Sequence, residues 1–383
     1  MHLLKENKMR TVLFIGNYTD DVTYDAITKR NIRDLSQASR MFQKRFIDCL
    51  ADADVDFKVV SLVPTNGQID LPTLFTDRKI NISVVPVKNG SIRSTFDAMK
   101  VIKEIVSDIN SDSISIVMYA VNPIGLIPLL RLKRKLNLTL TTICPELPNF
   151  RRYKKSFKNT MKRRVLDFFN KRFDKYIVFS EAMKKYLPSN RQFMLLEGFA
   201  PDTIQKPCIR EKNIAMYAGG LAEDNGIKIM IEAARKSKLI DELWICGVGD
   251  TLEYVKKNAD KKIKYLGRLA NDDVVEAEKK AKVLLNVRDP SNELTKFSFP
   301  SKVLEYMAAG GMVISTMLPG IPKEYYSFIK TLDEYSAINL ASKMDEVFQT
   351  DDDQFISATT AASEFITKKQ PKSRSKEIVS FIA

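Results

Sequence analysis

Short apolar, β-branched runs alternate with helical patterns along the first half of the chain. Between the first two runs, Leu35, Ala38 and Phe42 recur every three or four residues, which is the spacing of one face of an amphipathic helix. Such alternation predicts a parallel sheet with helices on both faces. The strand-like runs are residues 11–16, 57–63, 80–87, 113–119 and 138–144.

The alternation restarts after a polar, proline-containing stretch at residues 197–208, which suits a linker between domains. The second set of strand-like runs comprises residues 213–220, 242–249, 263–267, 282–287 and 312–316. Because 383 residues exceed what one hydrophobic core usually supports, we predict an α/β protein with two doubly wound, Rossmann-like domains, residues 1–200 and 201–383. Such sheets bind ligands at the carboxyl ends of their strands, which places a site in a cleft between the domains.

The C-terminal tail is expected to be helical in two pieces, with a break near Pro371. The final piece, about residues 371–383, could cap the second domain or pack back on the first. Its periodicity does not distinguish these two arrangements.

Composition narrows the class of protein. With 44% hydrophobic and 28% charged residues, the chain is globular and not disordered. It has no apolar run of 18 residues and no apolar signal-peptide core before its first strand-like run. Its four cysteines form no CxxC pair and are expected to be reduced thiols. We therefore expect a cytoplasmic protein without a transmembrane helix.

The chain has a single histidine, His2. This excludes most Ser-His-Asp, Cys-His and histidine-ligated metal chemistry. Any catalysis must therefore use carboxylates, lysine, arginine, hydroxyls or backbone dipoles. The D-x-D formed by Asp351 and Asp353 precedes a helical segment and is interpreted as a helix cap, so we expect no metal site.

The formal net charge of +14 implies an anionic partner. From Arg151 to Tyr176, eleven Lys and Arg are offset only by Asp167 and Asp174, which leaves +9 in this stretch. The phenylalanines between these cations are typical of a surface helix at an anionic bilayer. A solvated helix with a buried aromatic stripe is the plain alternative. Nucleic-acid binding would fit the charge, but no nucleic-acid-binding module accompanies it.

Glycines follow several strand-like runs of the second half, at Gly219, Gly220 and Gly247. Glycine at such positions lets a ligand approach the backbone closely. The sequence CGVGD around Gly247 is a weak dinucleotide signal, because Leu252 replaces the third glycine of G-x-G-x-x-G. A simple strand-to-helix turn is the alternative explanation.

Residues 297–316, FSFPSKVLEYMAAGGMVIST, predict a short helix followed by a strand. Ser298 or Ser301 can cap this helix. Lys302 is unexpected in the first turn, because helix N-termini disfavour cations. A bound diphosphate would reverse the sign of the local field there. Glu305, off the apolar face, could accept hydrogen bonds from two ribose hydroxyls.

This segment strongly resembles the nucleotide-sugar segment of retaining, GT-B-fold glycosyltransferases, in particular glycosyltransferase family 4, the group 1 glycosyl transferases. Residues 213–236 resemble that family's strand, glycine turn and helix after the linker, and residues 173–188 resemble the elements that close its first domain. Residues 282–302 look like the version found in enzymes of bacterial cell-surface polysaccharide assembly. CPELPNF, residues 144–150, resembles a Pro-Asp-Leu-Pro element near the acceptor side of that subgroup.

The resemblance implies a GT-B fold and a retaining, metal-independent hexosyltransferase without a cofactor. Its donor would be a UDP- or GDP-sugar, and its acceptor a hydroxyl of a lipid-linked or glycan molecule in cell-envelope polysaccharide synthesis. The family's proposed front-face route lets the leaving diphosphate help deprotonate the acceptor. Such an enzyme would be peripheral at the inner face of the cell membrane. The implied nucleotide-sugar residues are Gly219, Gly220, Gly247, Arg288, Ser298, Pro300, Ser301, Lys302, Leu304 and Glu305.

The chain departs from the family at three positions. Phe297 replaces the first of two glutamates, which normally contacts donor-sugar hydroxyls; Glu293 or Thr295 could substitute for it. Gly220 and Asn225 occupy positions where relatives often have an arginine and a lysine. Because unpaired phosphate charge is costly in a partly desolvated site, the cations are expected to come from Lys302 and Arg288, although Arg288 could also be a structural arginine at a strand end.

On the acceptor side, the candidates are Gly16 and Asn17 after the first strand, and Glu146. The two residues after the strand could equally form a plain loop. Glu146 is a candidate catalytic group beside Lys302 and Arg288; alternatively, it is a carboxylate fixed in a proline-flanked turn. The departures also leave open a catalytically inactive GT-B homologue that binds a nucleotide or a partner.

Overall fold

The computed structural model describes residues 10–24, 37–53, 55–65, 74–77, 80–88, 91–111, 113–147 and 156–383. It divides the chain into two compact units. The first comprises residues 1–179, 183–196 and 371–383, and the second comprises residues 180–182 and 197–370. His2 and the first five residues of the basic stretch lie outside the described residues.

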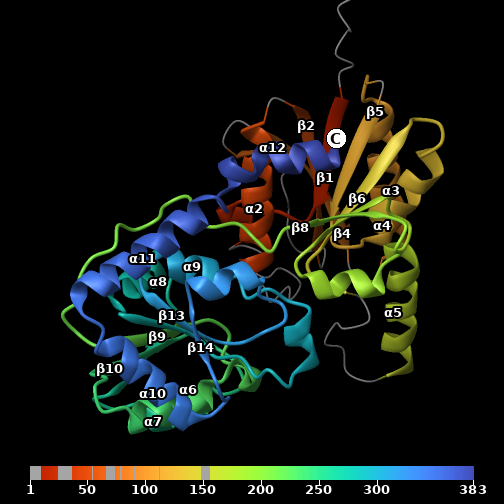
Figure 1. Cartoon of the computed structure of the whole chain (residues 1–383). Helices are drawn as coiled ribbons and strands as arrows, with labels where there is room; N and C mark the ends of the chain where they lie inside the picture. Colours follow the sequence, from red (N-terminus) through yellow and green to blue (C-terminus); the bar gives the residue numbers. More distant parts are fainter. Residues whose placement is uncertain are drawn as a thin grey trace, which may run out of the picture. The chain divides into compact units, whose positions relative to one another are not determined.

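The first unit is built on an eight-stranded sheet with the order β3-β4-β2-β1-β5-β6-β7-β8 (Figure 1). All neighbouring strands pair in parallel except the edge pair β3 and β4. The strands are β1 (Arg10–Gly16), β2 (Asp56–Thr65), β3 (Leu74–Asp77), β4 (Ile80–Lys88), β5 (Ser113–Tyr119), β6 (Leu138–Cys144), β7 (Lys175–Val178) and β8 (Gln192–Leu195).

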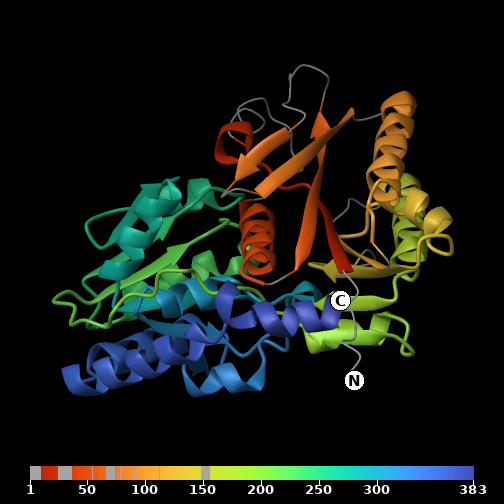
Figure 2. The ribbon, with the colours of Figure 1, turned by 90° about the horizontal axis from the view of Figure 1, so that it is seen from above.

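Helices cover this sheet in two groups, as the parallel crossovers require. Figures 1 and 2 both show α3, α4 and α5 together on one side, and α3 packs on α4. The C-terminal helix α12 packs instead against α2. The helices are α2 (Gln37–Ala51), α3 (Ile92–Ser107), α4 (Pro123–Leu132), α5 (Phe157–Asn170) and α12 (Pro371–Ile382).

The second unit is built on a six-stranded, wholly parallel sheet with the order β11-β10-β9-β12-β13-β14. This order reverses direction between β9 and β12, which is the topological switch point of a doubly wound sheet. The strands are β9 (Ile214–Ala218), β10 (Glu242–Cys246), β11 (Ile263–Gly267), β12 (Val283–Asn286), β13 (Met312–Thr316) and β14 (Lys330–Leu332).

Two apolar clusters bury the faces of this second sheet. One cluster joins it to α6, α7 and α10, and the other joins it to α8, α9 and α11 (Figure 1). The predicted α/β class with two doubly wound sheets is thus confirmed. The helices are α6 (Ile227–Lys236), α7 (Leu252–Asn258), α8 (Asn271–Lys280), α9 (Lys302–Ala308), α10 (Ala337–Phe348) and α11 (Asp352–Thr367).

The segments that connect the two units are tied together within the second unit. The buried carboxylate of Glu197 accepts hydrogen bonds from Lys369 Nζ at 2.7 Å and from the Tyr325 hydroxyl at 2.8 Å. Burial opposes the charge of Glu197, but Lys369 holds its pKa below the ordinary value. Gln370 donates to the carbonyl of Pro201 at 3.0 Å. The Glu197–Lys369 ion pair therefore joins the two segments at which the chain enters and leaves the second unit.

Candidate functional site

The predicted nucleotide-sugar residues gather at the carboxyl edge of the second sheet. Gly219 and Gly220 directly follow β9, and Arg288 follows β12, so they flank the switch point. Gly247 follows β10, and the loop from β12 leads into the first turn of α9, which holds Lys302. Open α/β sheets bind their ligands at this position.

Backbone packing requires one glycine of this edge, Gly247, whereas Gly219 faces a side chain. Gly247 has a φ of 137°, and a Cβ there would lie 1.8 Å from the carbonyl oxygen of Gly219. A Cβ on Gly219 would meet the Tyr217 hydroxyl at 2.9 Å. Gly220, in contrast, has room, since the nearest atom is the Asn225 side-chain nitrogen at 3.8 Å. Close approach of neighbouring turns thus explains Gly247 without a ligand.

Lys302 lies between two carboxylates of its own unit. Its Nζ is 2.8 Å from Oε2 of Glu305 and 3.9 Å from Oε1 of Glu278 on α8. The side chains of Lys302 and Glu305 are about one-third exposed, whereas that of Glu278 is 3% exposed. Burial opposes the charge on Lys302, but both glutamates raise its pKa above the ordinary value. The two glutamates therefore account for a lysine in the first turn of α9 without a ligand. The predicted diphosphate would be a second reason for it.

Arg288 approaches the same point from another element. Its guanidinium donates to Oγ of Ser298 at 3.3 Å. The Tyr217 hydroxyl donates to the carbonyl of Gly220 at 2.8 Å. Burial raises the pKa of Tyr217 to about 12, and the charges of Arg288 and Lys302 oppose that rise. Both cations therefore act on a hydroxyl that is bonded to the Gly220 turn.

The first turn of α9 differs from its predicted form. Ser301 is the N-cap, but no side-chain hydrogen bond caps the helix, and the Ser298 hydroxyl accepts from Arg288 instead. Pro300 is buried in the preceding turn, and the side chain of Leu304 is fully buried in the apolar cluster, so neither presents side-chain surface to a ligand. The helix has only seven residues, so its dipole is short. Lys302 therefore adds side-chain charge to a helix end that has no side-chain cap.

The position of the missing family glutamate is apolar and internal. Phe297 is 9% exposed, and its carbonyl accepts a hydrogen bond from Ser180 at 3.1 Å. Of the two expected substitutes, Thr295 is buried and donates to the carbonyl of Asn292 at 2.6 Å. Glu293 is exposed and lies 3.8 Å from Lys296. Glu293 therefore keeps an accessible carboxylate, whereas the Thr295 hydroxyl is already used.

The acceptor-side candidates lie at the carboxyl edge of the first sheet, on separate strands. The backbone amide of Asn17 donates to the Gln43 side chain at 2.9 Å, and Gln43 donates back to Asn17 at 2.7 Å. A Cβ on Gly16 would lie 2.2 Å from that same Gln43 oxygen, which explains the glycine. Glu146, just beyond β6, is exposed.

Sequence reasoning missed Glu278, the buried carboxylate beside Lys302. Its Oε1 has no hydrogen-bond partner among the described residues. Burial raises its pKa to about 7; Lys302 opposes this rise and Glu305 adds to it. A signal was present, because Val274 on α8 lies four residues before Glu278 and Ala281, just after the helix, lies three residues beyond it, and both pack in the apolar cluster. The charged sequence around Glu278 obscured that pattern.

The remaining motifs resolve into structural roles or surface features. Asp351 caps α11 by accepting from the amide of Gln354 at 2.8 Å, which confirms the interpretation of the D-x-D as a cap. Within the described ranges, no group of three His, Cys, Asp or Glu could hold a metal ion. None of the helices described is long and apolar enough to cross a bilayer.

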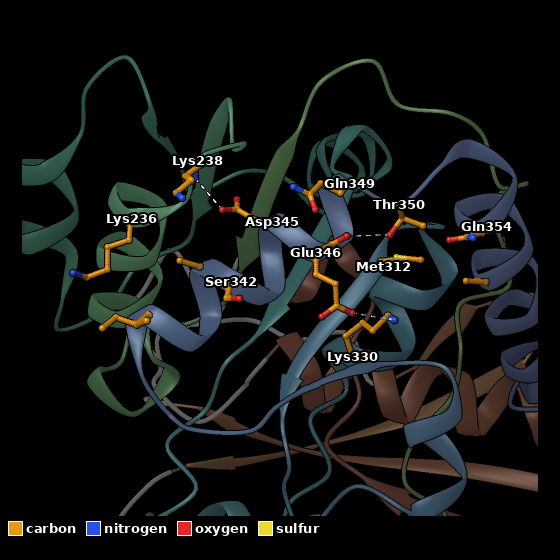
Figure 3. Close-up of a pocket in the computed structure, with 13 residues that line it drawn as sticks. Lys236, Lys238, Met312, Lys330, Ser342, Asp345, Glu346, Gln349, Thr350 and Gln354 are labelled. Atoms are coloured by element: carbon orange, nitrogen blue, oxygen red, sulfur yellow. Dashed lines mark hydrogen bonds and ion pairs between the residues drawn. The ribbon is translucent and has the colours of Figure 1, made fainter.

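A separate hollow in the second unit lies at the amino ends of the strands, opposite the carboxyl ends that carry the candidate site (Figure 3). Met312 and Lys330, which begin β13 and β14, line it together with α10. Among its lining residues, Lys330 pairs with Glu346 at 3.5 Å, and the backbone amide of Lys238 donates to Asp345 at 3.0 Å. The hollow is therefore distinct from the edge that carries the candidate site.

Comparisons with known proteins fit this geometry. Residues 212–346 match the model of the family described as glycosyl transferases group 1. A comparison with curated protein sequences finds no match. Sucrose-phosphate synthase from Thermosynechococcus elongatus has a TM-score of 0.69 at 12% identity over 97% of this chain and 98% of its own. Anabaena HepE in complex with UDP and glucose has a TM-score of 0.64 at 12% identity over 97% of this chain and 98% of its own. WaaB, a lipopolysaccharide outer core galactosyltransferase, has a TM-score of 0.62 at 14% identity over 97% of this chain and 99% of its own.

At these identities the solved structures establish the fold alone, and the family model matches the part of the second unit that holds the candidate site. The fold extends over nearly the whole chain. The family match covers all six strands of the second sheet and most of helix α10. The chain has the GT-B fold, and residues 212–346 of its second unit are similar to the group 1 glycosyl transferases.

Proposed function

We propose that the protein is a retaining glycosyltransferase that uses a nucleoside-diphosphate sugar. The observation that carries this proposal is that Lys302 and Arg288 both act electrostatically on Tyr217, whose hydroxyl donates to the carbonyl of Gly220. These residues lie at the switch point of a sheet that matches the group 1 glycosyltransferase model. HepE, a structural neighbour, is known in complex with UDP-glucose. The nucleotide of the donor is UDP or GDP.

The proposed chemistry needs positioning and charge stabilisation more than an enzyme nucleophile. Lys302 and Arg288 would bind the diphosphate and stabilise the charge that develops as it leaves. Glu305, which is about one-third exposed beside Lys302, would accept hydrogen bonds from the ribose. In the front-face route the sugar–phosphate bond breaks, the acceptor oxygen bonds to the same face of the sugar carbon, and the leaving diphosphate takes the acceptor proton. No metal enters this scheme.

Helix α5 supports a lipid-linked acceptor at a membrane surface. Four apolar side chains at helical spacing are exposed: Phe157 at 84%, Met161 at 44%, Val165 at 46% and Phe168 at 54%. A buried aromatic stripe would require the opposite; the two fully buried aromatic side chains in the described part of the basic stretch, Phe173 and Tyr176, lie beyond the helix. Exposed lysines flank the stripe, so the face suits anionic lipid headgroups, at about 1 kcal/mol per cation.

The same face supports the proposed acceptor class. We place the protein at the inner side of the cell membrane, where it would extend a lipid-linked precursor of a cell-surface polysaccharide. WaaB, a galactosyltransferase of the lipopolysaccharide outer core, has the same fold. Flotation with vesicles that contain anionic lipid tests this placement: binding should weaken in Phe157→Ser/Phe168→Ser and in high salt. Ile338→Ser, an exposed apolar position on α10 of the second unit, is the control.

A catalytically inactive homologue is the second candidate. It is favoured by the buried ring of Phe297, where the family has a carboxylate for the donor sugar, and by Gly220 and Asn225, where relatives often have cations. Such a protein would still bind a nucleotide or a partner.

A panel of UDP- and GDP-sugars separates these candidates. A transferase should release nucleoside diphosphate from one of them, faster with an acceptor present. An inactive homologue should bind the nucleotide sugar without releasing diphosphate. If donor binding by Lys302→Ala and Glu305→Ala equals that of the parent chain, the site assignment is wrong.

A further inference from the structure

The buried carboxylate of Glu278 has no task in the chemistry above. It belongs to α8 and not to the loop that carries the predicted donor residues. Its side chain is 3% exposed, and its Oε1 has no hydrogen-bond partner within the described part of the chain. An ionised carboxylate oxygen that is buried without a hydrogen bond costs free energy, so a neutral form is favoured when the site gains negative charge.

Glu278 shares a single cation with a second carboxylate. Lys302 Nζ is 2.8 Å from Glu305 and 3.9 Å from Oε1 of Glu278, so the closer pair is Lys302 with Glu305. When both glutamates are ionised, these three residues carry a net charge of −1. A diphosphate at Lys302 would add further negative charge beside an incompletely compensated carboxylate.

We propose that Glu278 is a proton-holding positioning residue, which takes up one proton when the donor diphosphate binds at Lys302. This inference rests on the proposed function, because it takes the diphosphate site from it. The proton comes from solvent and ends on the Glu278 carboxyl. Lys302 then has only Glu305 as an ionised neighbour and can turn its charge to the phosphates.

Among the residues that the structure describes, the surroundings of Glu278 supply no other group for this role. Lys302, Glu305 and Tyr306 on α9 all interact with it electrostatically. The Tyr306 hydroxyl is fully buried, lies 3.0 Å from the amide nitrogen of Ala218 on β9, and has a pKa raised well above its ordinary value by burial. Tyr217 on β9 couples to Lys302.

The remaining titratable neighbours are accounted for as well. Cys246 at the end of β10 lies in the apolar cluster beneath α8. On α8 itself, Lys279 pairs with Glu276 at 2.5 Å. Both tyrosine hydroxyls stay protonated near neutral pH, because burial raises their pKa values above 10. Glu278, whose pKa lies near 7, is the group in this set that can change its proton in that range.

The direction of the coupling follows from the sign of the charges. At pH 8 the free protein holds Glu278 mostly ionised, so donor binding must add a proton and is weakened. At pH 6 the proton is already present. Replacing Glu278 by glutamine fixes the neutral form at both pH values, keeps the shape of the side chain and leaves Glu305 to hold Lys302.

Calorimetry of UDP and GDP binding in two buffers of different ionisation enthalpy tests this coupling. At pH 8 we expect the parent chain to take up close to one proton more per nucleotide than Glu278→Gln, and the variant to bind about tenfold tighter. At pH 6 the two should bind alike. Glu276→Gln, an exposed substitution on the same helix, should match the parent chain throughout.

Each outcome decides the question. Equal proton uptake and equal affinity at pH 8 in the parent chain and Glu278→Gln would overturn the role of Glu278 and leave the donor site intact. Weaker binding by Glu278→Gln at both pH values would assign Glu278 a purely structural role and also overturn it. If neither nucleotide binds the parent chain at either pH, the donor site itself is refuted. A melting curve at pH 6 establishes that the variant is folded.

Discussion

Replacing Glu278 by glutamine should make the second unit more stable above neutral pH. Burial raises the pKa of Glu278 from 4.5 to about 7, so the folded state holds this proton more tightly than the unfolded state does. The cost of ionising the buried carboxyl is absent below pH 4.5 and grows until the pH passes about 7. The parent chain therefore loses stability over this interval, and the variant does not.

The magnitude follows from the interval between the two pKa values. At about 1.4 kcal/mol per pKa unit, the difference between 4.5 and about 7 corresponds to about 3 kcal/mol of unfolding free energy. For a unit of this size, each kcal/mol changes the melting temperature by about 2–4 °C. Glu278→Gln should thus melt roughly 6–12 °C above the parent chain at pH 8, and close to it at pH 5.

Thermal unfolding monitored from pH 5 to pH 8 measures this difference directly. All other titrations are common to the two proteins and cancel in the comparison. Glu276→Gln, which removes an exposed carboxylate from the same helix, should follow the parent chain. Parallel melting curves for Glu278→Gln and the parent chain across the whole range would refute the assignment of a strained, buried carboxylate.

Three further predictions test the site and its frame. Lys302→Met and Arg288→Met should each weaken nucleoside-diphosphate binding by roughly tenfold to a hundredfold, because each removes a charge-assisted contact. Calorimetry measures these affinities, and the control Lys279→Met should bind like the parent chain. Equal affinities in all variants would contradict the predicted cation pair. Gly247→Ala should lower the melting temperature, because its Cβ would lie 1.8 Å from a carbonyl oxygen, whereas Gly220→Ala has 3.8 Å of room and should be tolerated; similar melting of the two would contradict the packing argument. Lys369→Met should cost about 3–5 kcal/mol by leaving Glu197 buried without its cation, while the surface substitution Lys343→Met should cost less than about 1 kcal/mol. Because Lys369 lowers the pKa of Glu197, this stabilisation is present above the ordinary pKa of 4.5 and is lost as the pH falls through the lowered value, so the two proteins should converge in acid.

Hydrophobic periodicity predicted most strands of both sheets, including the edge strand β11, but missed the interior strand β7 and three short edge strands. Strands such as β1 and β5 are buried runs whose pattern is plain in the sequence. In contrast, β3, β8 and β14 have three or four residues and lie at sheet edges, where a neighbouring strand and not their own pattern defines them. The break near Pro371 was predicted, since α11 ends at Thr367 and α12 begins at Pro371.

The candidate site was predictable in its parts and not in its charge balance. Motif resemblance placed Lys302, Arg288 and Gly220 at one edge, because all three follow strands of the same sheet. It could not place Glu278, since a contact between α8 and α9 depends on packing across the sheet face. Side-chain burial also decides the environment of Leu304 and Phe297, which motif spacing leaves open.

The central claim is that the second unit binds a nucleoside-diphosphate sugar through Lys302 and Arg288 and that the protein transfers the sugar. The most direct measurement is the release of nucleoside diphosphate from a panel of UDP- and GDP-sugars by the parent chain and by Lys302→Met, with and without a lipid-linked acceptor. The account predicts release from at least one donor, stimulated by the acceptor and lost in the variant. Equal release by the two proteins, or no release from any donor, would contradict it.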